Sequence, residues 1–287
     1  MRVAAIVTVC MLLAATGWSE SPERQLKREL KGKTVLIRGF FEDDRLEYTA
    51  EGEVMGTPRA GSWTVSKMQV KSIAVRPDRF EVRGPRVITF MDLSTGEFTT
   101  LKPSKKHTIK MIVHAPATLD SQQLDMVIHK VLVTEPTPDI SVFPSYWREF
   151  LSGHVIRVKD KDGRLLFKRR DAADAEARND DQPVYTDAAG NPVFRVSKSM
   201  DVPRILHQID PEFSESARAQ KFSGTTVVSL ELDKSGGVRD VQIVQPIGYG
   251  LDDQAVQAVE QWRFAPAVRN GEPVAVLLMV EVSFKLY

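Results

Sequence analysis

The fold of this chain is decided by residues 203–287, where four short motifs follow one another: Asp210-Pro211-Glu212-Phe213, Leu251-Asp252, Trp262-Arg263-Phe264-Ala265-Pro266 and Asn270-Gly271-Glu272-Pro273-Val274. Asp210 stands before a proline, a pattern typical of a helix N-cap followed by proline at the first helical position. We expect a short helix through Ala217 and Ala219 to follow. Val228, Leu230 and Leu232 then recur at every second residue, which predicts a strand with one buried face.

A turn and a longer helix follow that strand. The glycine-containing residues 234–237 separate it from a second alternating run that ends at Val244, so the two runs predict a β-hairpin. Further along, five apolar residues recur at helical spacing: Leu251, Ala255, Ala258, Val259 and Trp262. They fall on one stripe of a helix, for which Asp252 is the expected cap.

The last run of the chain is its most regular predicted strand. Apolar side chains alternate through it without a break: Val274, Val276, Leu278, Val280, Val282, Phe284 and Leu286. A small slip in register would expose all of them, so the buried face of this strand is strongly specified. Residues 201–287 therefore predict a two-layer α+β domain, in which two helices lie on one face of a three- to four-stranded antiparallel sheet.

The order and spacing of these motifs resemble the C-terminal domain of the TonB family of energy transducers. Members of that family link the proton motive force of the inner membrane to outer-membrane transporters in diderm bacteria. The family's proline-x-tyrosine-proline signature is represented here by Pro211-Glu212-Phe213-Ser214. The position before it, often a glutamine that touches the transporter, is Asp210. The resemblance implies a TonB-like fold, an outer-membrane transporter or other envelope protein as partner, and Asp210 and Phe213 as contact residues.

The N-terminus has the pattern of a secretory signal peptide. A basic residue, Arg2, precedes an apolar stretch that ends at Ala15, and small residues at Gly17 and Ser19 suit a signal peptidase. The stretch is shorter than the roughly 20 apolar residues that a membrane span requires. We therefore expect residues 1–19 to be a signal peptide, the mature chain to have no membrane span, and its location to be periplasmic.

Residues 33–151 are rich in short runs of β-forming residues. Turn-forming pairs such as Gly84-Pro85 separate these runs as far as about residue 114, at intervals typical of sandwiches and barrels. We expect an all-β antiparallel barrel or sandwich here, with no helix inside it. Helical spacing returns after Asp120. A further short helix with three aromatic residues is expected to close one end of the barrel: Tyr146, Trp147 and Phe150.

Residues 152–200 connect this β-rich domain to the C-terminal domain through two predicted hairpins and a charged linker. From Lys168 to Gln182 charged residues alternate with alanine and large apolar residues are missing, which is typical of a solvated linker. The sequence thus predicts a signal peptide at 1–19, a β-rich domain with closing helices at 33–151, hairpins and linker at 152–200, and a TonB-like domain at 201–287.

Composition and motifs argue against an enzyme, a metalloprotein or a nucleic-acid-binding protein. The formal net charge is +1, so no basic excess attracts nucleic acid. His107 and His114 flank a strand and are expected on opposite faces, where they share no metal. Asp160-Lys161-Asp162-Gly163 begins like a calcium loop but lacks the later acidic ligand, which favours a plain turn. The chain contains no glycine-flanked serine elbow, phosphate loop or zinc-binding helix. The single cysteine, Cys10, lies in the predicted signal. We expect no catalytic residue, cofactor, metal or disulfide.

The final strand is the expected partner-binding site, because an unpaired strand edge can add an extended peptide by β-augmentation. The predicted binding residues are Val274, Val276, Leu277, Leu278, Met279, Val280 and Val282, together with Asp210 and Phe213. Leu277 and Met279 are expected to be exposed on the face opposite the buried stripe. The alternative for this edge is that another segment, such as the hairpin ending at Val196, already covers it.

Two functions of different classes fit these features, with an envelope hydrolase as the least favoured third. The first is a periplasmic adaptor for envelope transport or energy transduction, which binds a partner through its C-terminal domain. The second is a β-barrel that binds a small ligand or glycan, with the TonB-like domain as a docking or dimerising element. A deep pocket lined by Trp63 and Phe90 would favour the second function. A filled barrel beside an open sheet edge would favour the first.

The signal peptide gives the first testable prediction. We expect export and cleavage near Ser19, and the mass of the mature chain measures the cleavage point directly. Recovery of an uncleaved chain, still carrying Met1, from membranes washed with salt and carbonate would show an N-terminal anchor instead.

Overall fold

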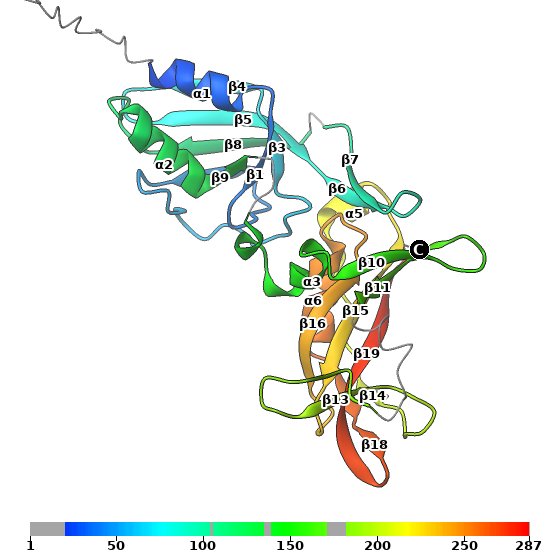
Figure 1. Cartoon of the computed structure of the whole chain (residues 1–287). Helices are drawn as coiled ribbons and strands as arrows, with labels where there is room; N and C mark the ends of the chain where they lie inside the picture. The colour runs from blue at the N-terminus through cyan, green and yellow to red at the C-terminus, as the bar shows by residue number, and fades with distance from the viewer. Residues whose placement is uncertain (1–20, 104–105, 135–138, 171–181, 287) are drawn as a thin grey trace, which may run out of the picture.

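The computed structural model of the chain describes residues 21–103, 106–134, 139–170 and 182–286. The predicted signal peptide lies outside the described residues, and so does most of the predicted charged linker. Figure 1 shows an N-terminal unit of one sheet with two helices, and a C-terminal unit built around a second sheet. Among the described residues, no helix is long and apolar enough to cross a membrane.

The N-terminal unit is built on a seven-stranded sheet. Its strands are β1 (Thr34–Ile37), β2 (Arg45–Tyr48), β3 (Lys67–Gln69), β4 (Ser72–Val75), β5 (Phe80–Val87), β8 (Thr108–Val113) and β9 (Leu132–Thr134). The order is β2-β8-β5-β3-β1-β9, with β4 paired to β5. The pair β2 and β8 is parallel, and β2 and β9 end the path without meeting. The prediction of an antiparallel barrel or sandwich is therefore wrong for this unit, which is an open mixed sheet.

Two helices cover one face of this sheet, so the unit is not all-β. They are α1 (Pro22–Leu30) and α2 (Ser121–Val131). Leu26 and Leu30 of α1 are fully buried in the same core as Leu124 and Ile128 of α2. Asp120 caps α2 in a reciprocal pair of hydrogen bonds with Gln123. Because this core is packed between helices and sheet, the unit has a filled interior.

The C-terminal unit confirms the predicted periodic elements. The hairpin β15 (Gly224–Leu232) and β16 (Val238–Gln245) pairs through β15 with the long strand β19 (Glu272–Phe284), and all three strands are antiparallel. The helices α5 (Glu215–Ala219) and α6 (Leu251–Val259) are also present. The predicted stripe of α6 is buried in one cluster with the alternating residues of β15 and β19.

The predicted helix caps are wrong, and the reasons are local. Ser214, not Asp210, caps α5: its hydroxyl accepts a hydrogen bond from the Ala217 amide at 3.1 Å. The N-cap of α6 is Gly250, with a positive φ of 76°. Asp252 lies inside the first turn of α6. Its carboxylate accepts hydrogen bonds from the amides of two residues that precede the helix, Ile247 at 2.9 Å and Gly248 at 2.7 Å.

Several short strands extend the C-terminal unit beyond the predicted three or four. The hairpin β12 (Tyr185–Thr186) and β13 (Pro192–Arg195) joins β19 in parallel, and β18 (Ala267–Arg269) pairs with the start of β19. A separate two-stranded sheet contains β14 (Arg204–His207) and β17 (Arg263–Ala265). The hairpin β10 (Val155–Lys159) and β11 (Leu165–Arg169) packs on β16, where Phe167 contacts Val244. The sheet is thus mixed rather than purely antiparallel.

The two units share a core at their junction. The junction contains the hairpin β6 (Thr89–Asp92) and β7 (Glu97–Thr100), the 3₁₀ turns η1 (Ile140–Val142) and η2 (Ser145–Trp147), and α3 (Arg148–Leu151). Trp63 and Trp147 pack edge to face with centroids 5.3 Å apart, inside the cluster that also holds Val228 and Trp262. The closing aromatic residues therefore pack against the C-terminal unit, and the prediction that they close a barrel is wrong.

Backbone contacts fix this junction as closely as the aromatic rings do. The Met91 amide donates to the Ile247 carbonyl at 3.1 Å, and the Tyr249 amide donates to the Thr89 carbonyl at 3.0 Å. Gly248 has a φ of +83°, and a Cβ there would lie 2.4 Å from the Phe90 Cα. Only glycine suits both its backbone conformation and this close approach.

Two neighbouring carboxylates are buried next to the junction. Asp253 is 4% exposed and accepts a hydrogen bond from the Tyr146 hydroxyl at 2.8 Å, which connects η2 to α6. Asp252 is completely buried, and burial raises its pKa to about 7. Burial also raises the pKa of Asp253. The charged forms of both groups are therefore disfavoured in the folded protein.

These carboxylates predict a fall in stability as the pH rises. Folded Asp252 has a pKa of about 7 against an ordinary value of 3.8, so the folded chain holds its proton more tightly than the unfolded chain. Its contribution is complete below the ordinary value and is lost as the pH approaches the raised one. We expect urea denaturation to give a lower free energy of unfolding at about pH 8 than at about pH 5.

The variant Asp252→Asn is the matched control, because it cannot ionise. The difference between the two pH values should shrink in this variant, whatever its absolute stability. An equal or larger difference in the variant would show that other groups cause the pH dependence. The ion-paired Glu81, whose pKa the hydrogen bond from Arg83 helps to lower to about 2, titrates below this window.

Candidate functional site

The candidate partner site is one edge of β19. On one side, residues 276–284 of β19 pair with β15. Val276 and Leu277 also pair with β13, which must therefore lie along the opposite edge. On that opposite edge, no described strand pairs with Leu278–Phe284, which we call the open half of β19. The alternative weighed above is thus correct for residues 275–277, which the hairpin ending near Val196 covers, and does not extend to the open half.

The predicted binding residues divide according to the face of β19 on which they lie. Val276 and Val282 are buried in the core, while Val274, Leu278 and Val280 are half-buried against it. Met279 is 43% exposed, as predicted. Leu277 is only 7% exposed and packs with Val193 and Tyr185 of the covering hairpin. The prediction that Leu277 is exposed is therefore wrong, because a distant segment packs over it.

Phe213 lies at the end of the open half. Its ring packs perpendicular to the ring of Phe284 at 5.4 Å, and the Arg218 guanidinium lies 5.9 Å from its centroid. Asp210 is exposed, and its predicted capping role belongs to Ser214. Trp262 is a core residue whose indole donates to the Ile209 carbonyl at 2.9 Å. Phe213 is therefore the predicted contact residue outside β19 that lies at the end of this strand.

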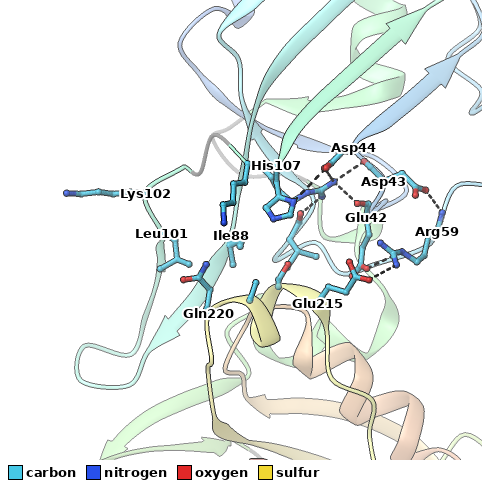
Figure 2. A pocket seen from close by; sticks show the side chains of 15 residues that line it. Glu42, Asp43, Asp44, Arg59, Ile88, Leu101, Lys102, His107, Glu215 and Gln220 are labelled. Atoms are coloured by element: carbon cyan, nitrogen blue, oxygen red, sulfur yellow. Dashed lines mark hydrogen bonds and ion pairs between the residues drawn. The ribbon is translucent and has the colours of Figure 1, made fainter. Parts of the chain in front are cut away.

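A second candidate is a cleft of about 670 Å³ between the N-terminal unit and α5. Figure 2 shows acidic residues 42–44 and Arg59 on one side of it, and His107, Ile88 and Leu101 on the other. Arg86 is 7% exposed and donates to four backbone carbonyls: Phe41, Glu42, Asp43 and Val65. It therefore holds the acidic loop in place and is already saturated with partners.

The charges of this cleft are largely paired within the chain. Arg59 reaches both Glu42 and Glu215 at 3.4 Å, which ties the N-terminal unit to α5. Burial raises the pKa of Glu42 in spite of this pairing. Asp43 accepts the Arg59 amide at 2.6 Å, whereas Asp44 faces Arg86 and His107, so the two neighbouring carboxylates point apart. The cleft therefore lies between two units that ion pairs hold together, and its charged side chains are largely occupied by partners within the chain.

The deep pocket that would favour the ligand-binding alternative is not formed by Trp63 and Phe90. Trp63 is 5% exposed and lies in the junction core, while Phe90 stacks on Tyr249 at 5.4 Å. Neither residue lines the cleft. The core of the N-terminal unit is filled by apolar residues of its sheet and both helices.

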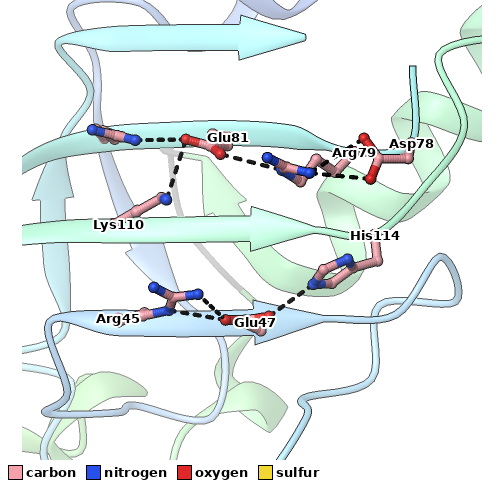
Figure 3. A network of polar contacts seen from close by, with 8 residues as sticks. Arg45, Glu47, Asp78, Arg79, Glu81, Lys110 and His114 are labelled. Carbon is pink, nitrogen blue, oxygen red and sulfur yellow. Dashed lines mark hydrogen bonds and ion pairs between the residues drawn. The ribbon is translucent and has the colours of Figure 1, made fainter. Parts of the chain in front are cut away.

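The remaining polar clusters are also satisfied locally. Figure 3 shows a charged ladder on the sheet face opposite α1 and α2, where Glu81 contacts Arg79, Arg83 and Lys110. Glu47 on the neighbouring strand β2 contacts Arg45 and His114. Among the described residues, no group of His, Cys, Asp and Glu side chains could hold a metal ion. The Asp160 carboxylate accepts hydrogen bonds from the amides of Asp162 and Arg164, as in a plain hairpin turn.

Comparison with known proteins finds sequence similarity in the C-terminal part of the chain. The family model of the Gram-negative bacterial TonB protein C-terminal domain matches residues 209–286. The chain carries a TonB C-terminal domain. Protein TonB of Vibrio cholerae is 30% identical over 107 residues, which are 37% of this chain and 44% of that protein. Protein tonB2 of Pseudomonas aeruginosa is 32% identical over 82 residues, which are 28% of this chain and 30% of that protein.

The chain therefore spans less than half of the length of either relative. The solution structure of the Pseudomonas aeruginosa TonB C-terminal domain is 22% identical, with a TM-score of 0.25, and covers 32% of this chain and 92% of that one. The match to the family model begins at Ile209, so it includes Phe213 and all of β19 but excludes the β12–β13 hairpin. The strand β13, which covers part of one edge of β19, therefore lies outside the residues that match the TonB C-terminal domain.

Polar substitutions at two positions on the same face of β19, one covered and one exposed, test this geometry. We expect Leu277→Asp to lower the free energy of unfolding by about 3 kcal/mol, because it buries a carboxylate against Val193 and Tyr185 of the β12–β13 hairpin. The neighbouring Met279→Asp changes an exposed side chain, so its effect should stay within about 0.5 kcal/mol. Urea denaturation followed by circular dichroism measures both values. Equal losses in the two variants would show that the hairpin does not cover Leu277.

Proposed function

We propose that this chain is a non-enzymatic periplasmic adaptor of TonB type, which binds an extended segment of an envelope protein along the open half of β19. One observation carries the proposal: Val276 and Leu277 have strand partners on both edges, whereas the open half has one only on the β15 side among the described residues. Its second row of backbone donors and acceptors is suited to an added strand.

The side chains around the open half support this role. Met279 is exposed and Leu278 and Val280 are half-buried, so an added strand would meet apolar side chains on both faces of β19. Phe213 extends the apolar surface at the Phe284 end. Main-chain bonds would then supply affinity, and these side chains would supply selectivity.

The likeness to TonB proteins supports an outer-membrane transporter as the partner and envelope energy transduction as the setting. The predicted signal peptide at 1–19 supports a periplasmic location for the chain. In this proposal the β-rich unit, predicted at 33–151, holds the TonB domain at 201–287 through the junction. The ligand-binding alternative has less support, since the interior that it requires is filled in the described chain.

Proline substitution at two successive positions tests the binding edge. Along a strand, successive amides point to opposite edges, so one of Met279 and Val280 donates toward β15 and the other donates outward. We expect the variant that removes the outward donor to stay folded and lose partner binding. The other variant should lose stability, because it breaks a bond within the sheet. Thermal denaturation separates the two.

Binding is measured by site-specific photo-crosslinking in an extract of the bacterial envelope. Glu281→Cys carries the crosslinker at the open half, and Met126→Cys carries it on α2 as a matched control, since both side chains are exposed. The expected product is an envelope protein attached through position 281 only and lost in the folded proline variant. Crosslinking that survives both proline substitutions would place the binding site elsewhere.

A further inference from the structure

A second exposed strand edge lies in the segment that leads into the TonB domain. Every residue of β14 is exposed, and two of its four side chains are large and apolar: Ile205 is 49% exposed and Leu206 is 69% exposed. Val202, just before the strand, is 54% exposed. Soluble proteins usually protect edge strands with charges or short length, so three neighbouring exposed apolar side chains here need an explanation.

The backbone of β14 is paired on one side. Arg204 and Ile205 lie opposite Ala265 and Phe264 of β17, and the register shifts by one residue before His207 meets Arg263. Among the described residues, no strand pairs with the other side of β14. Phe264 is buried beneath this pair, so β17 anchors β14 to the core while β14 itself remains at the surface.

The charges on these two strands favour one class of occupant. Basic side chains bracket the apolar pair at Arg204 and His207, and Arg263 lies across from His207. Neither strand contains an acidic residue. Arg204 and Arg263 are positively charged, so these strands are complementary to an extended segment in which acidic residues flank apolar ones.

The same pattern disfavours a second copy of this chain. If two copies of β14 paired antiparallel about the centre of the apolar pair, Arg204 of one copy would face His207 of the other. Neither β14 nor β17 contains an acidic residue, so this pairing would give Arg204 of each copy no opposite charge. Charge complementarity therefore selects a different, acidic segment.

We propose that β14 is a second docking edge, which binds an extended acidic and apolar peptide segment of a partner protein by β-augmentation. It is separate from the open half of β19, because β14 belongs to the two-stranded sheet with β17. It also lies outside the family match, which begins at Ile209. A chain with both edges can hold two segments at once, or two parts of one partner, with a gain in avidity.

The probe is a fluorescein-labelled synthetic peptide of about ten residues with the centre Glu-Val-Leu-Glu, and binding to the purified chain is followed by anisotropy. The matched probe replaces both glutamates with lysine. We expect the acidic peptide to bind, the lysine peptide to bind at least about tenfold more weakly, and affinity for the acidic peptide to fall with added salt.

Three variants assign the binding to β14. Leu206→Asp should weaken binding of the acidic peptide by about tenfold or more, and Arg204→Glu should invert the preference between the two peptides. Met126→Asp, an exposed apolar position on α2, should leave binding unchanged. Unaltered circular dichroism and melting temperature show that each variant is folded.

Four results would overturn the proposal. They are no binding of the acidic peptide, equal affinity for both peptides, an unchanged preference in Arg204→Glu, and a concentration-dependent dimer by light scattering that Leu206→Asp abolishes. The last result would assign the edge to a second copy. A fifth result would overturn it as well: loss of peptide binding in the folded proline variant of β19, with full binding in Leu206→Asp, would move the site to β19. Binding at β14 does not depend on the function proposed for the open half.

Discussion

The pairing of β19 with its neighbours is the constraint on which the C-terminal unit depends. Nine residues of β15 pair with residues 276–284 of β19 in an unbroken antiparallel register. That register fixes which side chains of β19 enter the core, since successive side chains of a strand face opposite ways. Val276, Val282 and Phe284 consequently meet α6 and the core side of β15, and Met279 is turned to the other face.

The junction between the units follows from the same sheet. The strand order of this sheet is β12-β13-β19-β15-β16. The strand β16 therefore forms one edge, and β15 separates it from β19. The N-terminal unit contacts β16 through η2 and α3, and its hairpin strand β6 bonds to the loop after β16. The units are therefore joined through the part of the sheet that lies away from the open half.

Periodic local signals made much of the C-terminal unit predictable, and non-local contacts account for the errors. The stripe of α6 and the alternation of β15 and β19 are visible in sequence because burial imposes spacings of 3.6 and 2 residues. The pairing of β13 with Ala275–Leu277 has no such signal, since any short apolar run could occupy that edge. For the same reason Leu277 and Met279 look equivalent in sequence, and only the hairpin distinguishes them. The architecture of the N-terminal unit was likewise missed for two reasons. The parallel pair β2 and β8 is a non-local contact, and α1 contains few apolar residues.

An exposed strand edge can pair with other chains and cause aggregation, so the edges that this chain covers can be compared with those that it leaves open. The β16 edge is packed against η2, α3 and β11 of the preceding chain. The first part of the other edge is covered by β13, which lies outside the recognised TonB domain. Covering segments are thus present on both sides of the sheet, and the pairing of β13 along β19 ends at Leu277. Because β13 runs parallel to β19 and its last paired residue, Arg195, lies opposite Leu277, residues 278–284 keep one edge without a described strand partner, and the proposed peptide binding rests on this edge.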